Sequence, residues 1–260
     1  MFIYNYHTHT SRCGHASGSD EEYVQAAIQA GYKVLGFSDH APYRQYPHPG
    51  SHMDWEMLDD YISSITSLKE KYKGQIEILL GMESEYYSYC YEERKELRGM
   101  LDYMLLGQHY DEPFGKHVNY FKSNSEEEIN EYADTVCEAI HTGLFSYICH
   151  PDVFMNHQED FTPACERAAH LIGKACQEEK LPVELNIRGV MKGKKPFPHG
   201  DQYWYPHKDF WRILSQHDIQ VAVGIDAHDP SDLLQTEFIE EGMKELEDLN
   251  LHFLDQPFIG

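Results

Sequence analysis

Histidine and carboxylate side chains occur in this chain in pairs whose spacing suits metal binding. His7 and His9 are separated by one residue, and Asp226 and His228 repeat that spacing near the other end of the chain. Because side chains alternate along a strand, two residues separated by one other point to the same side. Each pair can therefore reach one metal ion. His15, six residues beyond His9, is a further candidate ligand.

Residues of these types follow seven short apolar runs, which are rich in β-branched or aromatic residues, as is typical of buried parallel strands. The predicted strands are Phe2–Tyr6, Val34–Ser38, Ile76–Gly81, Tyr103–Leu106, Phe145–Cys149, Val183–Leu185 and Val221–Ile225. The polar residues at or just beyond their ends are His7, His9, Asp39, His40, Glu83, His109, His150, Asp152, Glu184, Asn186, Asp226 and His228. Since α/β folds build their sites at the carboxyl ends of parallel strands, we expect these side chains to meet on one face.

Longer amphipathic segments lie between the predicted strands. Ser19 with Glu22, and Ser125 with Glu128, have the spacing of capping boxes at helix starts. The predicted helices cover residues 19–31, Met57–Tyr72, Tyr91–Leu101, 125–143, a segment that starts at Thr162-Pro163, His207–Gln216 and Ser231–Leu249. Strands that alternate with helices predict an α/β fold with a parallel sheet, either open and doubly wound or closed into a barrel.

Two stretches rich in proline and aromatic residues, Ala41–Trp55 and Met191–Pro206, are predicted to be long loops. The composition, with 41% hydrophobic and 25% charged residues, is that of an ordinary globular protein. Neither a linker nor a low-complexity tract divides the 260 residues. We therefore expect residues 1–260 to form one domain.

The charge and the apolar pattern exclude several classes of partner. The net charge of −23 argues against general nucleic-acid binding, which needs basic surface. No apolar run is long enough to span a membrane, and no basic leader precedes an apolar core, so a cytoplasmic location is expected.

The six cysteines are scattered, so reduced thiols are expected. The sequence makes no prediction of the oligomeric state.

The ligand types indicate which ions the site would take. Imidazole and carboxylate together suit Zn²⁺, Mn²⁺ or Fe²⁺, and no thiolate ligand is expected. The number of candidate histidines and acids exceeds what one ion uses. A carboxylate such as Glu83 can bridge two ions in a hydrolytic centre. A multinuclear centre is therefore predicted, and bound cations would also attract an anionic substrate to this acidic protein.

The order of these motifs resembles that of the PHP (polymerase and histidinol phosphatase) family. The resemblance is carried by the HxH motif at His7, by His15, and by the stretches Phe37–Ala41, Leu80–Glu83, Gly107–His109, His150–Asp152 and Asp226–His228. The resemblance covers nearly the whole chain, and the overall order of the motifs is similar to that of the histidinol-phosphate phosphatase branch. The family fold implies a distorted (β/α)7, TIM-like barrel, which agrees with the seven predicted strands.

The resemblance also implies a set of metal ligands. It implies one ion held by His7, His9, Glu83 and Asp226, a second held by Glu83, His109 and His150, and a third held by His15, His40 and His228. Asp39 and Asp152 are then interpreted as groups that orient the imidazoles. Loop capping is the alternative interpretation for these two aspartates.

The expected reaction is hydrolysis of a phosphomonoester with three divalent metal ions. Arg188 is the first candidate for a basic group at the phosphoryl oxygens, with Arg44, Lys192, Lys194 and Lys195 behind it. Asp226 or a nearby histidine such as His228 is a candidate proton donor to the leaving alkoxide. In L-histidinol phosphate, the imidazole and the amine would meet the loop residues Tyr43, Tyr46, Asp54 and Trp55, although aromatic loop residues more often serve in packing.

Three functions remain open from the sequence. The first is hydrolysis of L-histidinol phosphate in histidine biosynthesis. The second is hydrolysis of another small phosphate ester or of a nucleic-acid end, and the acidic charge counts against a nucleic-acid substrate. The third is a metal-binding or regulatory domain without catalysis. The complete set of ligand types argues against this third function.

Overall fold

The computed structural model describes residues 3–112, 118–123 and 125–259, and its core is a curled sheet of eight parallel strands. The sheet order is β1 (Tyr4–Asn5), β2 (Val34–Phe37), β3 (Glu77–Ser84), β4 (Tyr103–Leu106), β5 (Tyr147–Ile148), β6 (Val183–Asn186), β9 (Gln220–Gly224) and β10 (His252–Phe253). All seven predicted strands are present, while β10 was not predicted. The α/β fold with a TIM-like sheet is thus confirmed, with one additional strand.

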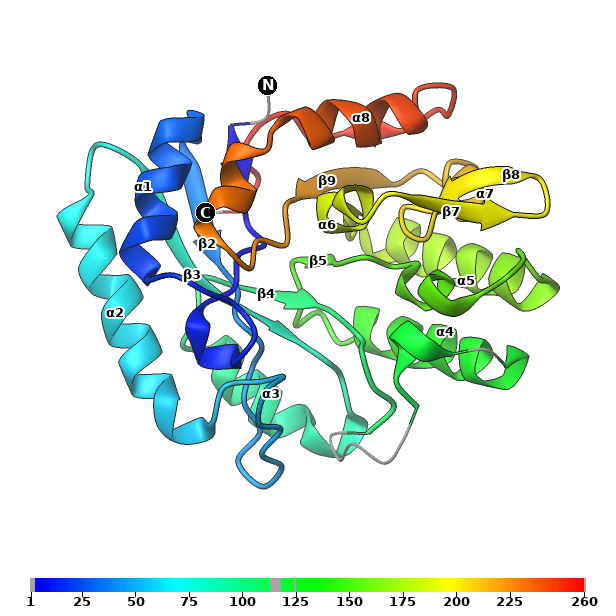
Figure 1. Cartoon of the computed structure of the whole chain (residues 1–260). Coiled ribbons are helices and arrows are strands. Elements are labelled where there is room, and N and C mark those ends of the chain that lie inside the picture. Colours follow the sequence, from blue (N-terminus) through cyan, green and yellow to red (C-terminus); the bar gives the residue numbers. More distant parts are fainter. Residues whose placement is uncertain (1–2, 113–117, 124, 260) are drawn as a thin grey trace.

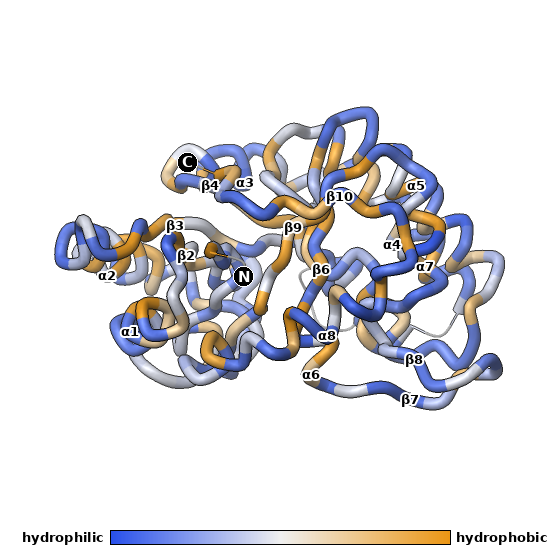
Figure 2. Tube along the Cα trace, turned by 90° about the horizontal axis from the view of Figure 1, so that it is seen from above, coloured by the Kyte–Doolittle hydropathy of each residue, from blue (hydrophilic) through white to orange (hydrophobic). Residues whose placement is uncertain are grey.

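Helices cover the outer side of the sheet (Figure 1). They are α1 (Asp20–Ala30), α2 (Leu58–Lys71), α3 (Tyr91–Arg98), α4 (Glu126–Ile140), α5 (Pro163–Glu179), α6 (Ile187–Met191), α7 (Lys208–Leu214) and α8 (Glu237–Glu245). Both predicted capping boxes are present, at Ser19 with Glu22 and at Ser125 with Glu128. Along these helices hydrophilic and hydrophobic stretches alternate (Figure 2). None of the helices in the described part of the chain has the length and apolar character that a membrane span requires.

Two segments differ from the sequence prediction. The expected helix Ser231–Leu249 is split, because a 3-10 helix, Pro230–Leu234, closes its own capping box between Asp229 and Asp232 before α8 begins. The stretch Met191–Pro206 is no irregular loop.

That stretch contains a two-stranded antiparallel hairpin of β7 (Lys194–Phe197) and β8 (Gly200–Tyr203). Its prolines suggested a loop, but a hairpin outside the main sheet tolerates them because its edges need no further partner.

The barrel is closed at the carboxyl ends of its strands. There the chain after β1 meets the chain after β9, where the amide of His9 donates to the carbonyl of Ala227 at 2.9 Å and the amide of Ala227 donates to the carbonyl of His7 at 3.1 Å. This junction places the first and last candidate ligand pairs side by side.

At the opposite ends, β10 pairs with β9 and the C-terminal segment fills the gap beside β1. The hydroxyl of Tyr4 donates to the carbonyl of Leu254 at 2.7 Å. The ring of Phe258 makes edge contacts with Tyr4 and Tyr6, with centroids 5.6 and 5.2 Å apart. The last described residues therefore pack against the chain at β1.

A layer of tyrosines fills the inside of the barrel. Tyr4, Tyr6, Tyr103 and Tyr147 are all buried and form one cluster with inward residues of the neighbouring strands. The ring of Tyr103 occupies the space left by two glycines, Gly36 and Gly81, where a Cβ would overlap it. Its hydroxyl proton is shared between two backbone carbonyls, that of Tyr6 just after β1 at 2.6 Å and that of Phe37 in β2 at 2.9 Å. This layer is a rigid floor for the residues at the strand ends.

We predict that Phe258→Ala lowers the free energy of unfolding by about 1–2 kcal/mol, less than for a fully buried phenylalanine because Phe258 is half-buried. Urea unfolding followed by circular dichroism measures the change. As a control, Tyr89→Ala, at a side chain that is 60% exposed, should change the stability by less than about 0.5 kcal/mol. Equal, small effects of both substitutions would contradict the structural role of the C-terminal segment.

Candidate metal centre

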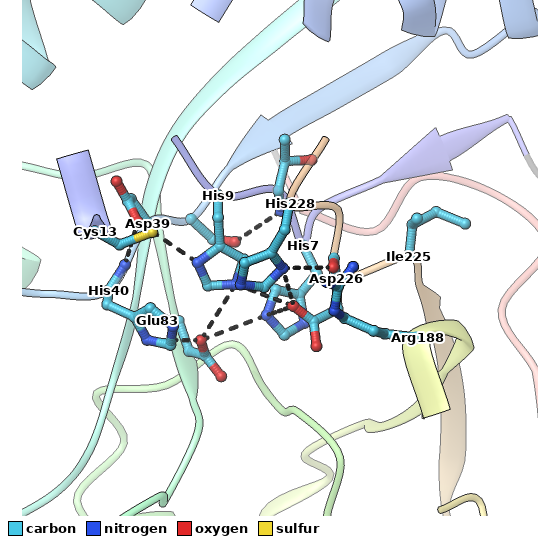
Figure 3. Close-up of polar contacts among 12 residues, drawn as sticks. His7, His9, Cys13, Asp39, His40, Glu83, Arg188, Ile225, Asp226 and His228 are labelled. Carbon is cyan, nitrogen blue, oxygen red and sulfur yellow. Dashed lines mark hydrogen bonds and ion pairs between the residues drawn. The ribbon is translucent and has the colours of Figure 1, made fainter. Parts of the chain in front are cut away.

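The nine candidate ligands lie together at the carboxyl ends of the strands. His7 and His9 follow β1, His40 follows β2, Glu83 is in β3, and the rest follow η1 (Ser11–Cys13), β4, β5 and β9. Each of these elements contributes through its last residues or the loop after it. Figure 3 shows ligands from opposite ends of the sequence turned toward a common centre.

One group of four ligand atoms surrounds a single point. Nε2 of His7 lies 3.5 Å from Oε2 of Glu83 and 3.5 Å from Oδ1 of Asp226. Nε2 of His9 lies 3.5 and 3.1 Å from the same two oxygens. Four ligands held about 2.0–2.1 Å from a tetrahedral zinc ion are themselves ~3.3 Å apart. The spacing of this group therefore fits one ion.

A second group uses the other oxygen of Glu83. Oε1 of Glu83 lies 2.9 Å from Nε2 of His150 and 3.3 Å from Nε2 of His109, and these two nitrogens are 3.3 Å apart. Glu83, which is 1% exposed, therefore stands between two groups of imidazoles. This is the arrangement of a carboxylate that bridges two ions.

The third expected group consists of His15, His40 and His228. His40 and His228 have ligand atoms close to those of His9, all within 4.8 Å of one another. The ring of His15 lies farther out, with its centroid 5.2 Å from that of His40 and 4.8 Å from that of His228. His15 is exposed because it follows the short 3-10 helix Ser11–Cys13 rather than a strand. It lies at the edge of the centre.

Several ligand atoms are buried and have no hydrogen-bond partner within the described residues. These atoms are Nε2 of His7, both ring nitrogens of His9, Nδ1 of His40, Oε2 of Glu83 and Oδ1 of Asp226. Leaving a buried polar atom unpaired costs about 1–3 kcal/mol. Their convergence indicates that they serve a cation, and the residues present therefore fit a centre of divalent metal ions.

The histidines are oriented through their other ring nitrogen. Nδ1 of His7 donates to Oε1 of Glu184 at 2.8 Å, and Nδ1 of His228 donates to the carbonyl of Asp226 at 2.9 Å. In both residues Nε2 then remains for the ion. A carboxylate behind a ligating imidazole fixes its tautomer and raises its basicity. The sequence placed Glu184 at the end of β6 but did not assign it this role.

Glu184 is itself held firmly. Its Oε2 accepts from the amide of His150 at 3.2 Å and from the side chain of Asn186 at 2.9 Å. Gly224 on β9 leaves the space for its carboxylate, since a Cβ there would overlap Oε1. Gly107 does the same for Glu83. Two glycines therefore allow both carboxylates to lie inside the sheet.

Glu85 orients another ligand and was also missed. Its Oε1 accepts from Nδ1 of His109 at 2.9 Å, and its Oε2 accepts from Nε2 of His52 at 2.9 Å. His52 belongs to the Ala41–Trp55 loop, so this loop is attached to the metal centre through one buried carboxylate. Glu85 is two residues beyond Glu83, a spacing that along a strand places both side chains on the same side, but the sequence analysis did not single it out.

The two aspartates interpreted as orienting groups have different environments. Oδ1 of Asp39 lies 3.5 Å from Nδ1 of His9 and accepts from the amide of His40 at 2.9 Å, while its Oδ2 accepts from the hydroxyl of Thr10. Asp152 instead accepts from the amide of His207 at 2.6 Å, at the start of α7. Asp39 therefore lies behind a candidate ligand, whereas Asp152 ties two loops together.

Two thiols lie beside the candidate ligands, although no thiol was expected there. Sγ of Cys149 is close to ligand atoms of His7, Glu83 and His150, and Sγ of Cys13 is close to His9. Burial raises the pKa of Cys149, so its thiol is neutral. Cys13 donates to the carbonyl of Thr10 at 3.1 Å. All six cysteines are free, as predicted.

The carboxylates at the centre are ionised and their charge is balanced by imidazoles. Burial raises the pKa of Glu83, but the neighbouring histidines outweigh this and hold it well below its usual range. His7 and the other neighbouring histidines likewise hold the pKa of Asp226 well below its usual range. Burial lowers the pKa of His7, yet the carboxylate of Glu184 and those around it raise it well above its ordinary value. Metal binding would therefore displace protons from this centre.

Two candidate ligands have backbone conformations that most side chains avoid. Asp226 has φ +57° and His150 has φ +28°. Such conformations persist only where the surrounding structure enforces them, and they concentrate at functional sites. At Asp226 the adjacent Ile225 is buried and its side chain points away from the ligands (Figure 3), so the turn separates a core residue from a site residue.

A cavity of about 310 Å³ opens onto this centre. Arg188 and Lys192 line it, together with seven of the ligand histidines and acids, as expected of basic groups near a phosphate. Arg188 is held by Asp232, with Nη1 3.1 Å from Oδ2. Tyr205, Phe121 and Tyr110 also line the cavity and were not predicted. Only their place beside the polar strand ends in the folded chain distinguishes them from other aromatic residues.

The other predicted substrate contacts do not line the cavity. The ring of Tyr43, a residue of the Ala41–Trp55 loop, is buried, and the guanidinium of Arg94 lies over it, 3.9 Å from the ring centroid. Arg44 is exposed, pairs with Glu96 and lies over the ring of Trp55 at 4.4 Å. These three residues therefore hold the Ala41–Trp55 loop together. The loop reaches the cavity with Gly50 and Ser51 instead.

Comparisons with known proteins agree with this architecture. A protein from Deinococcus radiodurans named "Probable histidinol-phosphatase" is 29% identical over 234 residues, which cover 87% of this chain and 86% of that protein. A Schizosaccharomyces pombe protein of the same name is 24% identical over 254 residues, which cover 86% of this chain and 80% of that protein.

Among solved structures, the histidinol phosphate phosphatase from Lactococcus lactis, in complex with zinc, L-histidinol and phosphate, superposes with a TM-score of 0.70. The two chains are 16% identical, with 97% of this chain and 95% of that one covered, so the likeness is one of fold. The PHP domain family model matches residues 5–188, which include β2 to β6 and seven of the nine candidate ligands. This chain belongs to the PHP domain family.

Proposed function

We propose that this protein is a metal-dependent phosphomonoesterase that hydrolyses L-histidinol phosphate to L-histidinol and phosphate. The observation that carries this proposal is the cavity itself. Converging imidazole and carboxylate groups, which fit divalent ions, line it together with Arg188 and Lys192. Positive charge from bound ions and from these two side chains is what the charge of a phosphate ester requires.

We propose that the nine residues hold three divalent ions, of zinc, manganese or iron. The two groups around Glu83 support two ions, because each oxygen of this carboxylate has its own set of imidazoles. The neighbouring rings of His40, His228 and His15 support a third. When bound, such ions would lower the pKa of a water molecule and neutralise charge on the phosphoryl oxygens.

The side chains of the protein have distinct tasks in this proposal. Arg188, fixed by Asp232, neutralises phosphoryl oxygens opposite the metal ligands. Glu184 and Glu85 keep His7 and His109 in the orientation that presents Nε2 to the cavity. The floor of tyrosines excludes water from below. Phosphate binding thus rests on fixed groups, which need no rearrangement as charge develops.

The aromatic lining supports an alcohol that carries an imidazole. Tyr110, Phe121 and Tyr205 line the cavity beside His109 and His150, and flat rings of this kind stack on an imidazole. The relatives named above as histidinol-phosphatases, and the Lactococcus lactis structure with L-histidinol and phosphate, support the same substrate. An acidic surface is compatible with the positive amine of that alcohol.

Phosphate release from L-histidinol phosphate is the direct test. With divalent ions present, we expect its kcat/KM to exceed that for sugar phosphates, nucleotides and DNA ends by at least about 100-fold. A chelator should abolish activity and added divalent ions should restore it. Similar, weak turnover of every ester would instead indicate a broad phosphoesterase. Absence of turnover with a full complement of metal would indicate a metal-binding domain without catalysis.

A second prediction concerns the ligands. His9→Ala should lower the metal content measured by elemental analysis and reduce activity by more than about 100-fold, since even loss of an orienting partner costs 10–100-fold. His199→Ala, at an exposed histidine of the β7–β8 hairpin, is the control and should leave both unchanged. If His9→Ala kept the wild-type metal content, the assignment of His9 would be wrong.

A third prediction concerns the support of His7. Glu184→Gln should weaken metal binding by about 10–100-fold while the fold is retained. In this variant an amide nitrogen would replace Oε2. This nitrogen is a donor, so it cannot accept the hydrogen bonds that Oε2 accepts from the amide of His150 and the side chain of Asn186. Competition with a chelator of known affinity measures the loss, and Glu96→Gln, at an exposed glutamate, is the control. Equal affinities for both variants would contradict the orienting role.

A further inference from the structure

Hydrolysis of an alkyl phosphate needs a proton donor as well as a nucleophile. The leaving oxygen of an alcohol departs as a strongly basic alkoxide unless it receives a proton during bond cleavage. In the proposed centre, Asp226 and His228 would hold metal ions. The candidate donors are therefore the other groups that line the cavity.

Among the cavity residues, Lys192 combines a transferable proton with access to the cavity. It follows α6, and its Nζ donates to the hydroxyl of Tyr205 at 2.6 Å. The ammonium lies over two aromatic rings that also line the cavity, 4.8 Å from the centroid of Tyr205 and 5.4 Å from that of Phe121. These contacts hold the end of a flexible side chain beside the place where the alcohol part of the ester would lie.

The charge environment of Lys192 differs from that of Arg188. Arg188 is ion-paired with Asp232, and a guanidinium does not release its proton at neutral pH. In the described part of the chain, no carboxylate lies within ion-pair distance of Nζ of Lys192. Partial desolvation lowers the pKa of Lys192, which makes its ammonium a better acid. Arg188 is therefore suited to hold the phosphate and Lys192 to give up a proton.

We propose that Lys192 is the catalytic acid that protonates the leaving alcohol oxygen, with Tyr205 and Phe121 holding its ammonium in place. This inference rests on the proposed function and assigns one step of it. As the bond between phosphorus and the alcohol oxygen breaks, that oxygen takes one proton from Nζ and the alcohol leaves neutral. Lys192 becomes a neutral amine.

The proton is replaced without any further reactant. Attack of water on phosphorus releases one proton for each turnover, and the amine of Lys192 recovers one proton from solvent. Lys192 is an exposed residue, so solvent can deliver this proton to its amine directly. Protons therefore balance over the cycle, and the products are the alcohol and phosphate.

Two esters with different leaving groups test the assignment. An alkyl ester such as L-histidinol phosphate needs the acid, whereas p-nitrophenyl phosphate releases an anion that is stable at neutral pH and does not. Lys192→Arg keeps the positive charge and a donor to Tyr205 but removes the acid. We expect it to lower kcat for the alkyl ester about 10²–10⁴-fold and to leave kcat for the aryl ester near the wild-type value.

Three further variants complete the experiment. Lys192→Met should show the loss on the alkyl ester and, because it also removes a positive charge from the cavity, a smaller loss on the aryl ester. Arg188→Met should lose activity on both esters, and Lys73→Arg, on the opposite edge of the barrel, should change neither. Elemental analysis should give every variant the metal content of the wild-type protein. This control separates loss of the acid from damage to the centre.

The outcome distinguishes the two proposals. Equal losses on both esters in Lys192→Arg, or no loss on either, would overturn the role of Lys192 and leave the phosphatase function intact. If the wild-type protein ignored L-histidinol phosphate but hydrolysed another alkyl phosphate, the substrate would be wrong, and the comparison would be made with that ester. If the wild-type protein with full metal hydrolysed no alkyl phosphate, both proposals would fail.

Discussion

The buried charge of Glu83 is the constraint around which the rest of this structure is arranged. Its carboxylate is 1% exposed and lies at the end of a central strand, where an ionised group requires compensation. Five imidazoles approach its two oxygens, those of His7, His9, His40, His109 and His150. They come from four different strands, and the parallel sheet is what brings the strands together. The fold can satisfy this carboxylate only if the strand ends stay in register.

The surrounding structure maintains that register through contacts that themselves do no chemistry. The bridge between the chains after β1 and β9 closes the barrel at the level of the ligands, and the tyrosine layer fills the space below them. Gly107 and Gly224 make room for two carboxylates where any side chain would displace them. Glu184 and Glu85 then fix the imidazoles. Orientation of the ligands is therefore distributed over the whole barrel.

The charge distribution separates the cavity from the rest of the molecule. The chain carries a net charge of −23, yet the side chains that line the cavity include two cations and several imidazoles. With divalent ions in the centre, the local field would be opposite in sign to that of the surface. A small anion that carries its own positive amine suits a positive cavity on an acidic protein. A polyanion suits it less well, because most of its length would lie against the negatively charged surface and be repelled. This contrast favours a small ester over a nucleic acid.

Much of the architecture follows from local sequence patterns. The seven strands, both capping boxes and the α/β fold class were all predicted correctly, because hydrophobic runs and caps depend on neighbouring residues only. The strand β10 and the β7–β8 hairpin were missed. The first is two residues long, and the second contains prolines that usually indicate a loop.

The candidate ligands could be selected from the sequence because residues at the carboxyl ends of parallel strands must meet on one face, whichever residues lie between them. The sequence could not assign the supporting groups. Glu184 and Glu85 orient imidazoles that lie more than twenty residues away, and Tyr205, which follows the hairpin, lines a cavity formed mainly by residues distant in the sequence. Tyr43 and Trp55 pack within their loop instead of lining the cavity. Residue type and spacing thus determined which chemistry the chain can perform. Tertiary packing decided which side chains orient the ligands and line the cavity. These contacts depend on distances between strands, which no local sequence pattern encodes.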